Sequence, residues 1–250
     1  MHIRRLTSLA AAALLAAAAA QPLAAQSVLY WTDENRGTSV IPDALTTLQT
    51  LRPGLTVTAA TNQLDFNTQL ASGAFDLAIF GEHGDVRFES SQSVLASFLD
   101  GGGLIIGATY RSSPMPGFFG ASVFSADQTS ISGSGALFAG LTSPISTTNP
   151  GWGISAQGYA GGESCLAAFE DASCAAVLGN GGRTLLLGPL FDSYAGTADG
   201  ARFVANGADL LLGDAGGTVT PEPATMALLG TGLLALGGVG ARRRRRGTAA

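Results

Sequence analysis

The side chains of this chain that could do chemistry are carboxylates grouped around one histidine. Glu82, His83 and Asp85 stand directly after an apolar stretch. A histidine between carboxylates can act as a general base, and together with Asp33 and Asp85 it could hold a divalent cation. Turns also favour Asp and Gly for backbone reasons, so the group could equally be structural. One histidine without a partner at metal-ligand spacing does not define a metal site, and we predict no metal and no other cofactor.

The segments before these residues indicate how they could come together. Apolar, strand-like stretches end close before Asp33, Glu82, Arg111 and Asp192. In a parallel sheet the carboxyl ends of the strands form one edge, where ligands usually bind. We therefore predict a candidate binding rim at this edge, made of Asp33, Glu34, Asn35, Asn62, Glu82, His83, Asp85, Arg111 and Asp192.

The first half of the chain alternates strands and helices. Uninterrupted apolar strands are predicted at 27–32, 55–60, 77–81 and 104–108. Between them lie helix patterns that begin near Ser39, at Asp65 and at Ser90 or Ser91, and each ends at a glycine or at Pro53-Gly54. This alternation is typical of a mostly parallel sheet that is covered by helices on both faces, an α/β fold of the amidotransferase-like or flavodoxin-like kind.

The second half of the chain follows a different pattern. Residues 111–160 are rich in Ser, Gly, Thr and Pro, with strand-like fragments at 121–124 and 136–138, and predict an irregular insertion. Stretches at 165–169, 174–178 and 184–188 then predict three antiparallel strands, with Asn180-Gly181 as a hairpin signal. A last helix begins near Asp199 and buries Phe203, Val204, Leu210 and Leu211.

The two cysteines of the chain, Cys165 and Cys174, flank the first turn of these antiparallel strands. In a chain exported to an oxidising compartment, this placement predicts a hairpin disulfide. A zinc site would need further ligands, and a catalytic thiol would need a basic partner. Closing so short a loop contributes about 2 to 3 kcal/mol by chain entropy.

The charge of the chain is unevenly distributed. All thirteen basic residues are arginines and seven of them lie in the two termini, whereas seventeen of the eighteen acidic residues lie between the termini. An acidic body would be repelled by nucleic acid, so no nucleic-acid partner is expected. No phosphate-binding loop, dinucleotide fingerprint or G-x-S-x-G motif is present in a strand-to-helix context.

Both termini have the character of targeting segments. Residues 1–25 predict a signal peptide that is cut before Gln26, because arginines precede an apolar stretch and small residues. A single domain at 26–213 and a linker at 214–220 follow. The uncharged run 224–241 would span about 27 Å as a helix, just short of a hydrocarbon core of about 30 Å. This run predicts a transmembrane helix, and the arginines after it should stay in the cytoplasm.

The C-terminal segment 221–246 resembles the PEP-CTERM protein-sorting signal. It combines Pro221, Glu222 and Pro223 with the apolar run and the cluster Arg242, Arg243, Arg244, Arg245 and Arg246. Thr220 stands where valine is usual. The resemblance implies processing by an exosortase, a membrane cysteine protease-transpeptidase of Gram-negative bacteria that make exopolysaccharide. An ordinary permanent anchor is the alternative.

The body resembles the class I glutamine amidotransferase-like fold, particularly its non-amidotransferase branches. The resemblance rests on FDLAIFGEHG, LASFLDGGGLIIGA, GALFAGL and GRTLLLGPLFDSY, and covers most of residues 27–213. An active amidotransferase has a cysteine after the fourth strand and a histidine after the last one. Here these places read Gly107-Ala108-Thr109-Tyr110 and Pro189-Leu190-Phe191-Asp192-Ser193. Glutaminase chemistry is therefore not expected, and no catalytic residue is assigned.

These features predict an exported, exosortase-sorted cell-surface or extracellular-matrix protein. Its body would be a non-catalytic binding module for a saccharide or another envelope component. The alternative is an extracellular hydrolase that acts on a glycan through His83 and the acidic rim. Expected partners are signal peptidase and the secretion machinery, the exosortase, the membrane through the C-terminal helix, and extracellular polysaccharide. The body should first lie outside the inner membrane, held by its anchor, and then reach the cell surface or the medium.

Overall fold

Successive residues of the strand Leu77–Glu82 (β3) belong to two separate apolar clusters. Leu77 and Ile79 lie in one cluster, and Ala78 and Phe80 lie in the other. Neighbouring side chains of a strand point to opposite faces, so an uninterrupted apolar strand needs a cover on both faces. The strand is accordingly buried along its whole length.

The computed structural model describes residues 26–33, 38–82, 87–110, 113–149, 153–154, 156–194 and 196–214. These residues belong to one compact unit, Ala25–Gly216. Five of its strands form the parallel part of the sheet, in the order β2-β1-β3-β4-β13. Besides β3, they are β1 (Ser27–Thr32), β2 (Thr56–Ala59), β4 (Leu104–Thr109) and β13 (Thr184–Leu187).

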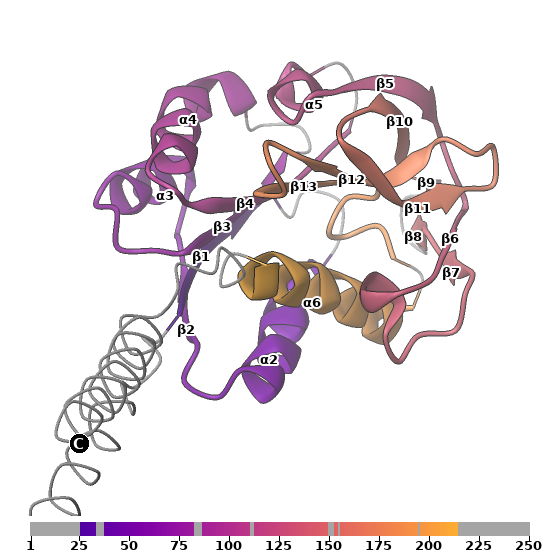
Figure 1. The fold of residues 1–250 in the computed structure, drawn as a ribbon, viewed down its shortest axis with the longest axis horizontal. Coiled ribbons are helices and arrows are strands. Elements are labelled where there is room, and N and C mark those ends of the chain that lie inside the picture. The colour runs from indigo at the N-terminus through magenta and orange to yellow at the C-terminus, as the bar shows by residue number, and fades with distance from the viewer. Residues whose placement is uncertain are drawn as a thin grey trace, which may run out of the picture. The chain divides into compact units, whose positions relative to one another are not determined.

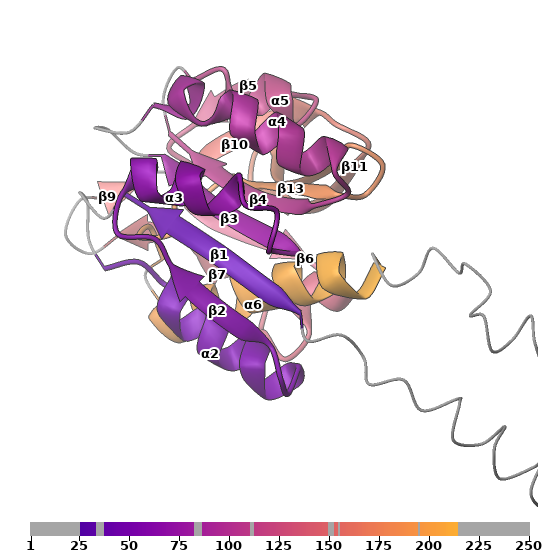
Figure 2. The same cartoon turned by 90° about the vertical axis from the view of Figure 1, so that its left-hand side faces the viewer.

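Two pairs of helices cover the two faces of this parallel part (Figures 1 and 2). On one face, α2 (Ile41–Leu51) packs beside α6 (Thr197–Asp214) over the cluster that holds Ile79. On the other face, α3 (Gln63–Leu70) and α4 (Gln92–Asp100) cover the cluster that holds Phe80. The predicted α/β fold with helices on both faces is confirmed.

The sheet continues beyond β13 as an antiparallel half, in the order β13-β12-β11-β6-β7. A branch leaves β12, because β10 pairs with β12 and β5 pairs with β10. A separate two-stranded sheet consists of β8 (Thr148–Asn149) and β9 (Gly153–Ile154). The bounds of the other strands are β5 (Ala121–Ala126), β6 (Ser130–Gly133), β7 (Ile145–Ser146), β10 (Gln157–Gly161), β11 (Ser164–Phe169) and β12 (Cys174–Gly179).

The segment 111–160, expected to be an irregular insertion, supplies four strands of the main sheet within its described part. The fragment predicted at 121–124 lies in β5, whereas Ala136–Phe138 forms a 3₁₀ turn (η2) instead of a strand. A four-residue helix, α5 (Met115–Phe118), precedes β5. The antiparallel half is therefore larger than the sequence predicted.

Two helix starts also differ from expectation, for local hydrogen-bonding reasons. Helix α3 begins two residues early because the Asn62 side chain accepts a hydrogen bond from the Asp65 N–H. A 3₁₀ turn, η1 (Phe88–Ser90), precedes α4, and Ser91 bounds that helix without capping it. Its hydroxyl instead accepts a hydrogen bond from the Gln63 side chain at 2.8 Å.

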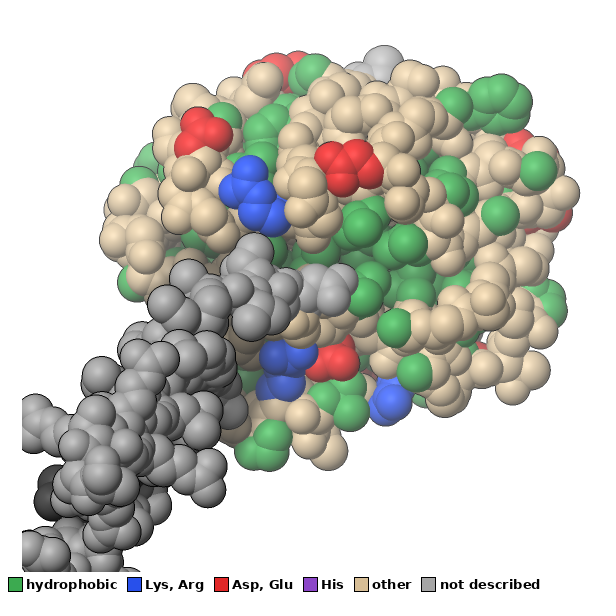
Figure 3. Space-filling view, in the orientation of Figure 1, with side chains coloured by type: hydrophobic (Ala, Val, Ile, Leu, Met, Phe, Trp, Pro, Cys, Tyr) green, Lys and Arg blue, Asp and Glu red, His purple; other side chains and the backbone are tan. Residues whose placement is uncertain are grey.

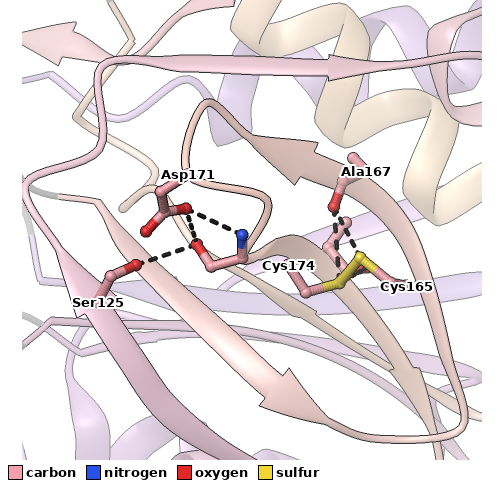
Figure 4. Close-up of a disulfide and its surroundings, with 7 residues drawn as sticks. Ser125, Cys165, Ala167, Asp171 and Cys174 are labelled. Atoms are coloured by element: carbon pink, nitrogen blue, oxygen red, sulfur yellow. Dashed lines mark hydrogen bonds between the residues drawn. A yellow bond between two sulfur atoms is a disulfide. The ribbon is translucent and has the colours of Figure 1, made fainter.

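The predicted disulfide between Cys165 and Cys174 is present in the β11–β12 hairpin (Figure 4). Beside it, Ser125 of β5 donates a hydrogen bond to the Ser173 hydroxyl, 3.0 Å away. The Ser173 hydroxyl donates in turn to Asp171. Gly158 leaves room for this chain of bonds, since a Cβ atom there would lie 1.8 Å from Ser173 Oγ. The hairpin is thereby fastened to β5.

Candidate functional site

The carboxyl ends of the parallel strands lie level with one another, as the predicted rim requires. Thr32 is opposite Gly81, and Glu82 is opposite Thr109. Asp33 and Glu82 lie at these strand ends, and Asp192 lies on the segment that follows β13. The other predicted rim residues Glu34, Asn35, His83, Asp85 and Arg111 fall outside the described part of the chain and stay predictions.

The segment with Asp192 is held against the end of β3 by Phe191. The Phe191 carbonyl accepts a hydrogen bond from the Val40 N–H at 2.8 Å, and its side chain is buried. A Cβ atom at Gly81 would lie 2.8 Å from Phe191 Cδ2, so a glycine is what lets this ring approach β3. Asp192 is itself buried and accepts a hydrogen bond from Ser193 Oγ at 3.3 Å.

The Glu82 carboxylate joins three segments at the rim. Its Oε1 atom accepts a hydrogen bond from the Phe88 N–H at 3.2 Å. Its Oε2 atom accepts hydrogen bonds from the hydroxyls of Thr109 at 3.0 Å and Ser113 at 2.6 Å. A buried carboxylate needs such donors to offset its lost hydration. Glu82 is therefore a positioning residue that ties β3 to η1 and to the segment after β4.

A buried tyrosine closes the rim beneath Glu82. The Tyr159 hydroxyl donates a hydrogen bond to the Thr109 carbonyl at 3.3 Å. Burial, and then the negative charge of Glu82, raise the pKa of Tyr159, so its phenol keeps its proton. A protonated phenol can donate this hydrogen bond at any physiological pH. Tyr159 thus fixes β10 against the end of β4.

Sequence reasoning missed a second polar pair at the rim. The Tyr110 hydroxyl donates a hydrogen bond to Asp127 Oδ1, 2.9 Å away. Tyr110 follows β4, and Asp127 follows β5 with a backbone φ of 59°. Asp is one of the few side chains that tolerate this left-handed conformation, in which it turns the chain sharply. The turn places the Asp127 carboxylate next to an aromatic ring at the strand ends.

Two glutamines extend this polar group. The Gln157 N–H donates a hydrogen bond to the Gly188 carbonyl at the end of β13, and the Gln128 N–H donates to the Ala156 carbonyl. Both side chains are buried. Gln128 Nε2 donates to the Ala126 carbonyl, while Gln128 Oε1 has no hydrogen-bond partner among the described residues. The available signal was the turn-forming Asp127 directly after a predicted strand fragment.

The place of an amidotransferase nucleophile has no room for a reactive side chain. A Cβ atom at Gly107 would lie 2.6 Å from Phe119 Cζ and 3.2 Å from the Met115 sulfur. Thr109 is fully buried, and its hydroxyl is bound to Glu82. Across the described ranges, no three His, Cys, Asp or Glu side chains are grouped so as to hold a metal ion.

Asn62 differs from its predicted place in the rim. Its side chain caps α3, with Oδ1 accepting from the Asp65 N–H at 2.9 Å. A cap of this kind stabilises a helix by about 1 kcal/mol. Asn62 therefore has a local structural role that accounts for its side chain.

The membrane and sorting predictions concern the chain beyond residue 214. Among the described helices, none combines the length and apolar character needed to cross a bilayer. The predicted span 224–241 lies outside the described residues and stays a prediction.

Comparison with known proteins gives two matches of different kinds. Among solved structures, the chain is similar to a GMP synthase protein from Thermoplasma acidophilum, which has the glutamine amidotransferase fold, at 14% identity. The match covers 76% of this chain and 96% of that one, with a TM-score of 0.48. No curated protein matches the chain in sequence. Residues 219–246 match the PEP-CTERM protein-sorting motif, so the chain carries the signal of an exported protein that an exosortase processes.

Proposed function

We propose that this protein is delivered to the cell surface or the extracellular matrix in three steps. Signal peptidase removes residues 1–25 as the secretion machinery exports the chain. The helix 224–241 then holds it in the inner membrane, with Arg242 to Arg246 on the cytoplasmic side because guanidinium groups cross a bilayer at high cost. The exosortase finally cuts near Pro221-Glu222-Pro223. The match at 219–246 supports this order of events.

The body, in this proposal, binds a saccharide at the strand-end rim without transforming it. The single observation that carries the proposal is the Tyr110–Asp127 pair, in which a hydrogen bond of 2.9 Å sets an aromatic ring beside a carboxylate. An aromatic ring offers an apolar surface, and a carboxylate accepts hydrogen bonds from hydroxyl groups. Both are what the faces and edges of a sugar ring require.

The charge of the rim narrows the class of saccharide. Asp33, Asp127 and Asp192 are carboxylates, and the body has many more carboxylates than arginines. Such a surface repels anionic polymers and favours neutral or amino sugars. We therefore propose a neutral or amino-sugar polysaccharide of the cell envelope as the ligand.

Binding is preferred to catalysis because of what surrounds the end of β4. Gly107 has no space for a side chain, and the Thr109 hydroxyl is buried and bonded to Glu82. A nucleophile must be exposed and must have a base beside it. Neither condition is met at these two positions.

A glycan array tests this proposal. The purified protein should retain neutral or amino-sugar glycans, and Asp127→Asn should weaken the retention while Asp199→Asn, an exposed change on α6, should not. Absence of binding to any glycan would overturn the proposal. Release of reducing sugar from a bound glycan would instead favour the hydrolase that the sequence left open.

A further inference from the structure

The strand β5 is an open edge of the main sheet. It is hydrogen-bonded to β10 alone among the described strands, so its other side presents unpaired backbone groups. Natural edge strands are usually protected by charges, by proline or by being short. The β5 sequence ASVFSA spans six residues and contains no charge and no proline. This edge is therefore open to another strand.

A bulge turns two apolar side chains of β5 toward solvent. Val123 is opposite Tyr159 and Ser125 is opposite Gly158, so Phe124 has no residue opposite it on β10. A bulge breaks the alternation of side chains and re-aims the extra residue. Val123 is 46% exposed and Phe124 is 66% exposed. Hydrophobic side chains gather at the upper right of Figure 3, over the region of β5 in Figure 1.

The other edges of the main sheet lack these features. The edge strand β2 has four residues, and its Val57 is partly buried against the core. The edge strand β7 has two residues. The other exposed large apolar side chains of the described body, Leu51 and Leu64, lie on helices. Of the strands that the structure describes, only β5 combines an open backbone with an exposed apolar pair.

We propose that β5 pairs with β5 of a second copy of this chain, antiparallel, across a two-fold axis at Phe124. A two-fold axis in an antiparallel pair places one residue opposite its own copy. Phe124 would then face Phe124, Val123 would face Ser125, and Ser122 would face Ala126. Aromatic pairs opposite each other stabilise such a ladder.

Charge favours a second copy as the occupant of this edge. Two copies of an acidic body repel each other wherever their carboxylates meet. On β5 no carboxylate meets its own copy, and in the proposed register Asp127 lies opposite Ala121 of the second copy. The strand is also held in place, because Ser125 is bonded to Ser173 in the β11–β12 turn (Figure 4). The edge is thus uncharged, apolar and preformed.

The test reverses charge at the axis. The purified full chain in mild detergent should be a dimer by light scattering after size exclusion. Phe124→Glu and Phe124→Lys each place like charges opposite each other, so each should raise the dimer Kd about tenfold or more. An equimolar mixture of the two variants places Glu opposite Lys and should restore dimers, as heterodimers.

Matched controls separate the edge from other surfaces and from misfolding. Leu64→Glu and Leu64→Lys change a side chain that is 76% exposed on α3 and should leave the dimer intact. Circular dichroism should show the same fold for all variants, because Phe124 is mostly solvent-exposed. A monomeric wild type, a dimer that survives both Phe124 changes, or a mixture that fails to pair would each overturn the proposal. The outcome is independent of glycan binding at the rim.

Discussion

The hydroxyl of Tyr110 and the carboxylate of Asp127 are joined by a hydrogen bond of 2.9 Å that links the end of β4 to the turn after β5. The two residues are seventeen positions apart in the chain, and their strands are not neighbours in the sheet. The bond fixes the ring direction at the rim. It gives the proposed saccharide site an ordered aromatic surface before any ligand arrives.

The first prediction concerns this pair. Tyr110→Phe removes the donor and Asp127→Asn removes the charge, so each should weaken binding of a neutral glycan about tenfold, the loss expected for one hydrogen bond to a charged group. Isothermal titration with a glycan identified on the array measures the effect. Unaltered affinity in both variants would remove this pair from the site.

The second prediction concerns the buried carboxylate of Glu82. Glu82→Gln keeps the shape of the side chain but turns an amide group toward the donors Thr109 and Ser113. The free energy of unfolding should fall by about 1 to 3 kcal/mol, the usual cost of unsatisfied buried polar groups. Urea denaturation measures it, with Glu89→Gln, a change at an exposed position, as the control. A loss no larger than that of the control would show that the three hydrogen bonds to Glu82 contribute little.

The parallel half of the fold could be predicted because its signals are local. Stretches such as LAIFG and LIIGA are apolar without interruption and stand between amphipathic helices. The rule that parallel strands end at one edge then placed Asp33, Glu82 and Asp192 correctly at or near the rim. Those inferences need no knowledge of long-range pairing.

The antiparallel branch could not be predicted because its contacts are long-range and its residues are small. Strands β5 and β10 lie more than thirty residues apart, and Gly158 has a place there only because Ser125 and Ser173 fill the space of a side chain. Ser- and Gly-rich segments show no apolar period that would indicate a strand. Asp127 and Gln128 were missed for the same reason, since their place depends on that pairing.

The third prediction concerns pH. Partial burial would raise the pKa of Glu170, but hydrogen bonds from Thr129 and Ser130 outweigh it and lower the pKa from 4.5 to about 2. A depressed pKa stabilises the fold fully above the ordinary value and loses that contribution as the pH falls toward about 2. Glu170→Gln should therefore be less stable than wild type at pH 6.

The size and measurement of this effect follow from the exposure of Glu170. The side chain is largely exposed, so solvent screening limits the difference to about 1 kcal/mol or less. Urea denaturation of both proteins from pH 6 to pH 2 should show the difference shrinking with falling pH. A difference that stays constant over this range would mean that the carboxylate charge is not responsible.

The fourth prediction concerns the disulfide. The bond joins Cys165 and Cys174, nine positions apart, and two free thiols should appear only after reduction. Replacing both cysteines by alanine should lower the free energy of unfolding by about 2 to 3 kcal/mol, chiefly because the unfolded chain gains freedom. Thiol titration of the unfolded protein and urea denaturation measure the two effects. A stability equal to wild type would show that the hairpin needs no covalent link.

The fifth prediction concerns the arginine cluster at 242–246. Replacing its five arginines by alanine removes the charge that should hold the C-terminus in the cytoplasm. The variant should show altered membrane retention and impaired processing when cell fractions are compared by immunoblot. Unchanged delivery to the surface would count against the role assigned to the cluster.

The most direct test of the account is the mass and location of the mature chain in an exosortase-containing cell. Intact-mass analysis of the surface and medium fractions should find a polypeptide that begins at Gln26 and has lost the arginine cluster 242–246. Full-length polypeptide, uncut at both ends and dissolved in the cytosol, would contradict the account.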